Sequence, residues 1–279
     1  AIALIWGVNN VAAKIAVDEL PPLLVGAMRF GIVLLALFWC IRPLARWQIW
    51  SSALMLMCLG PVHFAMLYVS LKMADNLAPM VVALQLWAPA SVVFATLILK
   101  ERVGALRWFG VGLAFAGVAG MAFDPIVFAQ VWALVIAGAA SCLYGLGAAL
   151  VRRVGEGMDA WSMQAWIALS TAPLLGLGSV AFEHDWLAQA RSASWLAWAC
   201  VVFGAVMSSI FANVLLVRLV QKYEVSRTTP YLLLTPLISF ALGAIVLGDP
   251  VTWRIALGAA ASLAGVALVA LAERRTVSA

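Results

Sequence analysis

One arginine stands in the middle of a long apolar segment. Arg29 lies nine residues into residues 20–41, about 13 Å along a helix that rises 1.5 Å per residue. A charge at that depth in a bilayer is costly, so its presence points to a role. Two interpretations stay open. Arg29 is either a structural residue bonded to carbonyls of a neighbouring helix, or a cation that, with Lys14, draws in a ligand carboxylate. Lys14 also has a simpler interpretation, because a lysine near a helix end can extend to the interface.

Histidines and carboxylates are scarce inside the apolar segments. His63 is the only histidine within one, and it is either a hydrogen-bonded core residue or a proton carrier. A buried carboxylate is the usual partner of a proton or an organic cation. All twelve carboxylates fall at or outside the segment ends: Asp18, Glu19, Asp75, Glu101, Asp124, Glu156, Asp159, Glu183, Asp185, Glu224, Asp249 and Glu273. This argues against a small four-helix multidrug-cation antiporter and favours facilitated diffusion.

Amide and aromatic side chains supply the remaining binding groups. Polar groups within apolar segments must face other helices or water, since lipid offers them no hydrogen bonds. Hydrogen bonding between helices explains each of them about as well as ligand binding does. Besides Arg29 and His63, the predicted binding residues are Trp6, Asn9, Tyr68, Gln85, Trp87, Tyr144, Trp161, Gln164, Asn213 and Tyr231.

Four prolines interrupt two apolar segments. Pro79 and Pro89 lie in residues 77–99, and Pro230 and Pro236 lie in residues 226–248. Proline removes a backbone donor and bends a helix. A static kink and a hinge both fit this pattern, and the paired positions favour the hinge.

The elements that carry these residues are predicted to be membrane-spanning helices. Apolar residues make up 66% of the 279-residue chain and charged residues 10%, and the mean hydropathy is +1.06. A spanning helix needs about 20 apolar residues. Ten such segments are present, and they predict an all-α membrane protein: about 1–17, 20–41, 48–71, 77–99, 104–123, 130–151, 159–182, 194–217, 226–248 and 252–272.

No motif indicates a cofactor, a metal or nucleic acid. The four cysteines lie inside apolar segments without disulfide or zinc spacing. His184, between Glu183 and Asp185, fits a solvated charge cluster better than a metal site. The net charge of +5 comes from scattered basic residues at segment ends. We therefore expect a monomer whose partners are the lipid bilayer and a small-molecule substrate.

The basic residues predict the orientation, because short loops rich in Lys and Arg stay in the cytoplasm. Alternate loops plus the C-terminal tail hold twelve of them, against four in the other loops. This places both termini in the cytoplasm. The chain begins inside an apolar segment, so we expect a few residues before Ala1.

The two halves of the sequence repeat one another. Leu99-Lys100-Glu101-Arg102-Val103 corresponds to Leu247-Gly248-Asp249-Pro250-Val251, and Ala116-Gly117-Val118-Ala119 to Ala264-Gly265-Val266-Ala267. A weaker match pairs Trp6-Gly7 with Tyr144-Gly145. The predicted units are residues 1–123 and 130–272, followed by a cytoplasmic tail, 273–279. Because five helices is an odd number, the second unit is inverted, as in alternating-access transporters.

These residues give the chain its resemblance to a known family. Trp6-Gly7 with Lys14, Ala27-Met28-Arg29-Phe30, and the Lys-Glu-Arg and Gly-Asp-Pro after the fourth and ninth segments resemble the EamA-type, ten-helix branch of the drug/metabolite transporter superfamily. The resemblance implies a basket of helices 1–4 and 6–9 around a central cavity. It also implies export of amino acids or related metabolites across a bacterial inner membrane, which favours zwitterionic, aromatic or hydrophobic amino acids as substrates.

Two other functions are weighed against this one. A sugar-phosphate or nucleotide-sugar antiporter needs several intramembrane cations to hold phosphate, and only Arg29 and Lys14 qualify. A membrane-embedded enzyme needs a catalytic constellation at one depth, which a single intramembrane histidine does not supply. We therefore predict a transporter without enzymatic activity.

Overall fold

The computed structural model describes residues 1–43, 49–101, 103–154, 159–216 and 234–277. Nearly all of these residues are helical, and no strand occurs among them. The helices are α1 (Ile2–Glu19), α2 (Pro22–Leu37), η1 (Phe38–Cys40), α3 (Ile49–Leu59), α4 (Pro61–Met73), α5 (Leu77–Leu84), α6 (Trp87–Leu99), α7 (Ala105–Met121), α8 (Pro125–Ala129), α9 (Val131–Val154), α10 (Ala160–Phe182), α11 (Trp186–Ser192), α12 (Trp195–Phe203), η3 (Gly204–Ala212), α15 (Leu234–Leu242), η4 (Gly243–Leu247) and α16 (Trp253–Val277).

Seven helical units in the described residues are long and apolar enough to cross a membrane. They are Pro22–Cys40, Ser52–Met73, Leu77–Leu99, Val131–Arg152, Ala160–Phe182, Trp195–Leu216 and Trp253–Leu271. Two shorter apolar helices, Ala105–Met121 and Leu234–Leu247, accompany them. The predicted all-helical membrane fold is confirmed at this level. The count of ten spans and the orientation of the termini stay predictions.

Two predicted spans are broken in the middle, each beside a proline. α3 and α4 meet at Gly60, directly before Pro61. α5 and α6 are separated by Gln85 and Leu86, with Pro89 in the first turn of α6. Proline has no N–H for the carbonyl four residues earlier, which here is that of Gln85. The Gln85 carbonyl instead accepts from Ala88 N at 3.3 Å. The break at Gln85 therefore follows from Pro89.

Short helices also form where the sequence predicted only connections. Asp124 caps α8, accepting from Ile126 N at 3.0 Å, and Pro125 starts the helix. The Asp124 carboxylate also accepts from Thr252 Oγ1 at 2.5 Å, which links this connection to the start of α16. These bonds lower the pKa of Asp124, the Thr252 hydroxyl contributing most.

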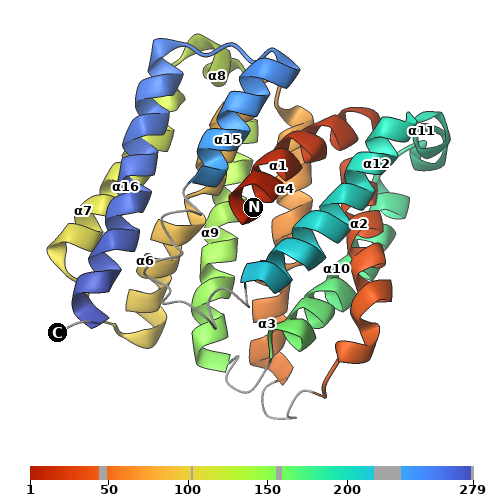
Figure 1. Ribbon diagram of the computed structural model, residues 1–279, viewed down its shortest axis with the longest axis horizontal. Helices are drawn as coiled ribbons and strands as arrows, with labels where there is room; N and C mark the ends of the chain where they lie inside the picture. Colours follow the sequence, from red (N-terminus) through yellow and green to blue (C-terminus); the bar gives the residue numbers. More distant parts are fainter. Residues whose placement is uncertain (44–48, 102, 155–158, 217–233, 278–279) are drawn as a thin grey trace.

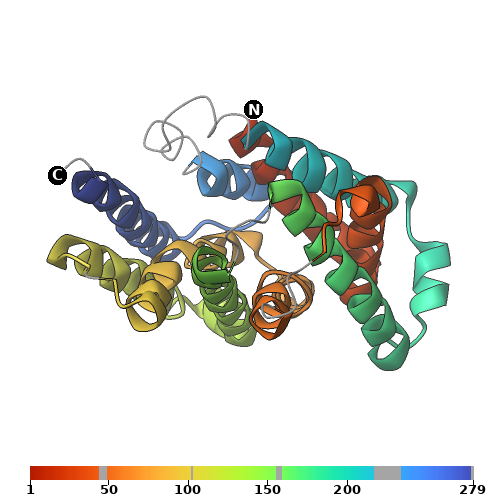
Figure 2. The same ribbon diagram turned by 90° about the horizontal axis from the view of Figure 1, so that it is seen from below.

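α7 and α16 pack against each other through glycines. A Cβ added at Gly117 would lie 2.4 Å from Ser262 N and 2.6 Å from Gly258 O. A Cβ at Gly265 would lie 2.4 Å from Ala114 N and 2.6 Å from Gly110 O. Rising residue numbers in α7 thus meet falling numbers in α16, so the two helices run antiparallel. Figure 2 shows this pair at one end of the long axis, with α2 and α10 at the other.

The weaker sequence match also has a structural counterpart. A Cβ at Gly7 of α1 would meet Ile238 in α15, at 2.5 Å from its Cγ2. A Cβ at Gly145 of α9 would meet Ala90 in α6, at 2.8 Å from its Cβ. Each glycine thus allows one helix from the other half of the chain to pack closely against its own helix. The two glycines are the ones that the sequence match pairs.

The ends of the two matching segments have the same backbone geometry. Lys100 follows α6 with φ 55° and Gly248 follows η4 with φ 72°. This left-handed conformation ends helices, and it suits glycine better than lysine. The following residues, Glu101 and Asp249, donate their N–H groups back to Ala95 O and Gly243 O, six residues earlier in each case. The pairing of these two loops predicted from sequence is therefore visible in their hydrogen bonds.

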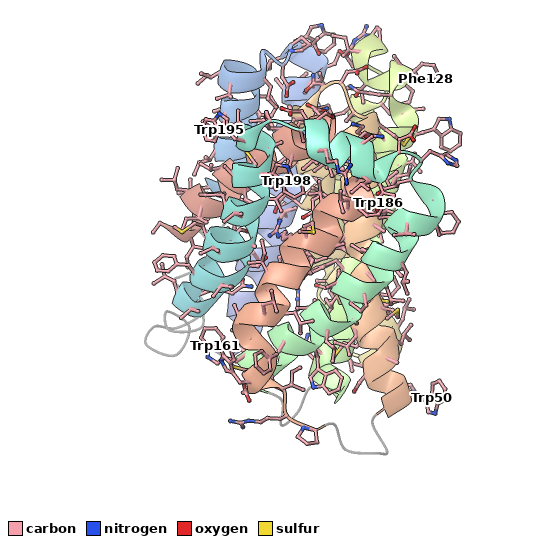
Figure 3. All side chains as sticks on the ribbon, turned by 90° about the vertical axis from the view of Figure 1, so that its right-hand side faces the viewer. Trp50, Phe128, Trp161, Trp186, Trp195 and Trp198 are labelled. Atoms are coloured by element: carbon pink, nitrogen blue, oxygen red, sulfur yellow. The ribbon has the colours of Figure 1, made fainter. Side chains whose placement is uncertain are left out.

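The connections gather at two ends of the bundle. Figure 1 shows the α15–α16 connection and α8 at the top, with the α6–α7 connection and the C-terminus at the bottom. In Figure 3, Trp50 and Trp161 lie at the lower end and Phe128 at the upper end. Large aromatic side chains at both ends are typical of a protein anchored at two membrane interfaces.

Candidate functional site

Arg29 is the centre of a buried polar cluster. Its side chain, on α2, is 7% exposed. Nε donates to Ser209 Oγ at 3.1 Å, and Nη2 donates to Ser208 Oγ at 3.2 Å and Ser209 Oγ at 3.0 Å. Nη1 donates to the Tyr68 hydroxyl at 3.1 Å. Within the described residues no carboxylate pairs with Arg29, and its hydrogen bonds go to neutral hydroxyls. The partners are side chains rather than the backbone carbonyls of the structural interpretation.

Aromatic rings border the guanidinium group on one side. Arg29 Cζ lies 5.8 Å from the centre of the Phe64 ring and 5.9 Å from that of Phe30. The two rings meet edge to face at 4.5 Å. A cation within about 6 Å of a ring is attracted by its electrons. The cluster thus combines a cation with aromatic surface.

The aromatic surface continues through His63 to α9 and α6. The His63 ring lies 4.9 Å from Phe64 and 4.8 Å from Tyr144. Tyr144 in turn lies 5.8 Å from Trp87. His63 is 7% exposed, and its Nδ1 lies 2.8 Å from Ala140 O. Because a carbonyl only accepts, this contact requires a proton on Nδ1. The geometry is that expected for a hydrogen-bonded core histidine.

Two neighbouring features explain how Tyr144 meets Trp87. Gly145 lets α9 approach α6 so closely that a Cβ added at Gly145 would lie 2.8 Å from Trp87 O. The break at Gln85 precedes Trp87 directly, so it sets where α6 begins. Gln85 is half-buried at this break. Gln85, Trp87 and Tyr144 therefore lie around one interruption of the α5–α6 unit.

α1 reaches the Arg29 cluster from the other side. Trp6 Nε1 donates to Ser208 O at 3.4 Å. Asn9 Oδ1 would lie 3.1 Å from a Cβ added at Gly204, the first residue of η3. Six of the predicted binding residues therefore join one connected region: Trp6, Arg29, His63, Tyr68, Trp87 and Tyr144.

Of the remaining predicted binding residues, Trp161 and Gln164 lie away from this region. Trp161 begins the first turn of α10 at the lower end of the bundle (Figure 3), and Gln164 is one turn further. Asn213 Nδ2 donates within its own helix, to Ser209 O at 2.9 Å. Tyr231 and Pro230 lie outside the described residues. Pro79 falls in the first turn of α5, where a missing N–H disturbs a helix least. Pro236 lies in α15.

Lys14 does not contribute its charge to this region. It is buried and forms an ion pair with Asp18, one turn along α1. Asp249, 7% exposed, accepts from Leu77 N at 2.9 Å and so joins the end of η4 to the start of α5. Burial raises the pKa of Asp249, while the hydrogen bonds from Leu77 and Ala78 oppose this rise. This polar contact lies at the end of the Leu77–Leu99 span and connects the two halves of the chain.

Sequence reasoning missed several partners of Arg29. Phe30 and Phe64 adjoin the predicted binding residues Arg29 and His63, and Ser209 follows Ser208, yet nothing in the sequence indicated their contacts with Arg29. A groove of about 400 Å³ lies between α7 and α16, lined mainly by apolar and small residues. It lies apart from the Arg29 cluster.

A bundle of apolar helices with a buried cation defines a multi-pass membrane protein. The chain belongs to the EamA-like transporter family, which it matches over residues 1–123 and 131–271. A "probable amino-acid metabolite efflux pump" of Salmonella typhimurium is 24% identical over 273 residues, covering 95% of this chain and 90% of the relative. An Escherichia coli K12 protein described in the same words is 24% identical over 280 residues, with the same coverage.

Two further similarities extend the comparison. An "uncharacterized transporter" of Archaeoglobus fulgidus is 25% identical over 272 residues, covering 95% of this chain and 94% of the relative. One solved crystal structure is similar over 99% of this chain and 96% of its own, with a TM-score of 0.61 and 20% identity. The family and the relatives indicate a transporter rather than an enzyme.

Proposed function

We propose that this protein exports zwitterionic metabolites, chiefly aromatic and other hydrophobic amino acids, across a bacterial inner membrane. The observation that carries the proposal is the Arg29 cluster. A buried guanidinium group that pairs with no carboxylate among the described residues favours a ligand that brings its own negative charge. The rings of Phe30 and Phe64 beside it favour a ligand with an apolar or aromatic part.

The relatives support this class of substrate. Two of them are described as probable amino-acid metabolite efflux pumps. Sugar phosphates fit the site less well, because Arg29 is the one cation in the cluster within the described residues, and a phosphate dianion needs several. One chain supplies every residue of the cluster, so the proposal requires no second copy.

Alternating access between two inverted five-helix repeats is the proposed mechanism. The antiparallel α7–α16 pair and the matched positions of Gly7 and Gly145 support this arrangement. Trp6 and Ser208 come from different repeats, as do Tyr144 and Trp87, so the site lies where the repeats meet. The proposed energetics is facilitated diffusion, since the carboxylates of the described residues lie at helix ends.

Liposomes holding the purified protein test the proposal. They are loaded with labelled phenylalanine, leucine, a nucleoside or a sugar phosphate, with the pH matched on both sides. We expect saturable efflux of the two amino acids down their gradient, and little efflux of the others. Efflux of the sugar phosphate but not of the amino acids would overturn the substrate class. A requirement for an imposed proton gradient would overturn facilitated diffusion.

A further inference from the structure

An ion pair joins the two halves of the chain at the lower end of the bundle. Arg152, near the end of α9, donates from Nη2 to Glu101 Oε1 at 2.6 Å and from Nη1 to Glu101 Oε2 at 3.3 Å. Glu101 follows α6, whose connection to α7 lies at the bottom of Figure 1. Two parallel hydrogen bonds between a guanidinium group and a carboxylate fix their relative geometry. This contact therefore holds the end of α9 against the end of α6.

The inverted repeat places a counterpart of this pair at the upper end. Lys14 follows the first paired glycine by seven residues, as Arg152 follows the second. Asp249 corresponds to Glu101 in sequence and in backbone geometry. The counterpart of Arg152 and Glu101 is thus Lys14 and Asp249, which are only 8% and 7% exposed. Burial raises the pKa of Asp249, and the charge of Lys14 lowers it, so the two groups lie within electrostatic range.

The upper cation is paired differently in this structure. Lys14 forms its ion pair with Asp18, on its own helix, and the Asp249 carboxylate accepts from Leu77 N. Among the described residues, no ion pair joins Lys14 to Asp249. Lys14 therefore has two acids near it, one from each repeat, and it is paired with the acid of its own repeat. Arg152 at the lower end is paired with the acid of the other repeat.

The helices that carry the two cations each cross a helix of the other repeat at a paired glycine. Gly7 brings α1 against α15, and Gly145 brings α9 against α6. The seven residues from each glycine to its cation span about 10 Å of helix. A change of about 20° in the crossing angle displaces the cation by about 3.5 Å, which is enough to break a hydrogen bond. Each crossing can therefore act as a pivot for the ion pair beyond it.

We propose that Arg152 with Glu101 and Lys14 with Asp249 form two symmetry-related gates, lower and upper, which close in turn. A formed ion pair holds its end of the bundle shut. When the upper gate opens, Lys14 transfers to Asp18, so the buried cation keeps a partner and avoids the cost of an unpaired charge. The lower gate is formed in this structure and the upper one is not. The inference rests on the proposed alternating-access mechanism and names the residues that alternate.

Cysteine labelling from each face tests the gates without reference to the substrate. Ser208→Cys places a reporter in the buried region where the repeats meet, in a chain whose four native cysteines are replaced by alanine. A membrane-impermeant maleimide is added either to intact cells or to inverted membrane vesicles, so that it reaches one face at a time. The labelling rate follows the population of the conformation that is open to that face.

The lower gate should control labelling from the lower face. An exposed ion pair shifts an equilibrium by up to about fivefold. Arg152→Gln should therefore raise labelling from the lower face about two- to fivefold and reduce labelling from the upper face. Exchange of the two charges, Glu101→Arg with Arg152→Glu, should restore the rates of the reporter chain.

A second ion pair at the lower end supplies the matched control. Arg42 Nε lies 3.2 Å from Asp159 Oδ2, and both side chains are partly exposed. This pair also joins the two repeats, but it belongs to α2 and α10, which are bonded at both ends through Arg42 N to Ser162 and Leu23 N to Glu183. Arg42→Gln should therefore leave labelling from both faces unchanged.

The two acids beside Lys14 give the sharpest test, because they should act in opposite directions. Asp249→Asn removes the acid of the upper gate but keeps an oxygen for Leu77 N, so labelling from the upper face should rise about twofold or more. Asp18→Asn removes the competing acid and leaves Lys14 to Asp249, so labelling from the upper face should fall. A static polar network would lose stability in both variants without this opposition.

The outcomes separate the gates from the mechanism on which they rest. Upper-face labelling that changes in the same direction in Asp249→Asn and Asp18→Asn, or in neither, would overturn the gates. If Asp249→Asn does not fold, the charge exchange at the lower gate decides, and failure to restore labelling there would overturn them. Labelling of the reporter chain from both faces would in either case leave alternating access intact. Labelling from one face only, or from neither, would overturn alternating access and the gates together.

Discussion

The glycine contacts between α7 and α16 give a quantitative test of the fold. In Gly117→Ala, the new Cβ would lie 2.4 Å from Ser262 N, and ordinary contact begins at 3.4 Å. The atoms it meets are backbone, so the two helices must separate by about 1 Å. Overpacking of this kind costs about 1–3 kcal/mol, and the gain from replacing a helical glycine offsets about 0.5–1 kcal/mol of it. We therefore expect net destabilisation of about 1–2 kcal/mol.

The repeat makes a second, stricter prediction about the same contact. Gly265→Ala meets Ala114 N and Gly110 O at the same 2.4 and 2.6 Å, so it should lower stability by the same amount as Gly117→Ala. Gly112→Ala is the control on the same helix, because no atom lies within 4 Å of its new Cβ. The assay is denaturant or thermal unfolding of each purified variant in detergent. A Gly117→Ala variant as stable as Gly112→Ala would refute the close packing. Unequal losses at Gly117 and Gly265 would refute the symmetry.

Three further changes test the site and its surroundings. Burial favours the neutral form of Asp249 and raises its pKa, so stability should fall as the pH rises from acidic to neutral. Asp249→Asn should remove this pH dependence, and identical pH profiles of stability in the wild type and Asp249→Asn would contradict the raised pKa. Asp249→Ala leaves Leu77 N without its acceptor and should lower the free energy of unfolding by about 1–3 kcal/mol. Pro89→Ala restores an N–H for the Gln85 carbonyl, so thermal stability should rise while transport slows; unchanged transport would make the break a static kink. Tyr144→Leu removes a ring beside His63 and Trp87, so the ratio of phenylalanine to leucine efflux should fall severalfold; an unchanged ratio would place aromatic selection elsewhere.

The sequence predicts the helices well because a helix that spans a bilayer needs about 20 mostly apolar residues in a row. Every described spanning unit coincides with a predicted apolar segment to within about two residues, although Ser52–Met73 and Val131–Arg152 end beyond the predicted 48–71 and 130–151. The loops at Glu101 and Asp249, which the sequence pairs, end their helices with the same backbone geometry. The short helices α8 and α11 were missed, because capping by residues such as Asp124 depends on only a few positions.

The site was predicted less completely, for a physical reason. The depth of Arg29 follows from counting residues, but its partners Ser208 and Ser209 are about 180 positions away. Their meeting depends on the π-helix of η3, which periodicity does not reveal. Trp161 and Gln164 matched the pattern of binding residues as well as Tyr144 did, yet they lie in the first turns of α10.

Binding of phenylalanine to the wild type and to Arg29→Met tests the central claim most directly. Arg29→Met leaves the hydroxyls of Tyr68, Ser208 and Ser209 without their donor, so thermal unfolding is measured first to confirm that the variant is folded. Equilibrium binding of labelled phenylalanine is measured in detergent, with unlabelled leucine or phenylethylamine as competitor. We predict saturable binding to the wild type that leucine displaces and phenylethylamine, which lacks the carboxylate, does not. Arg29→Met should be less stable than the wild type but folded, and it should lose this binding. Equal binding to both proteins, or equal displacement by both competitors, would contradict recognition of a carboxylate by Arg29.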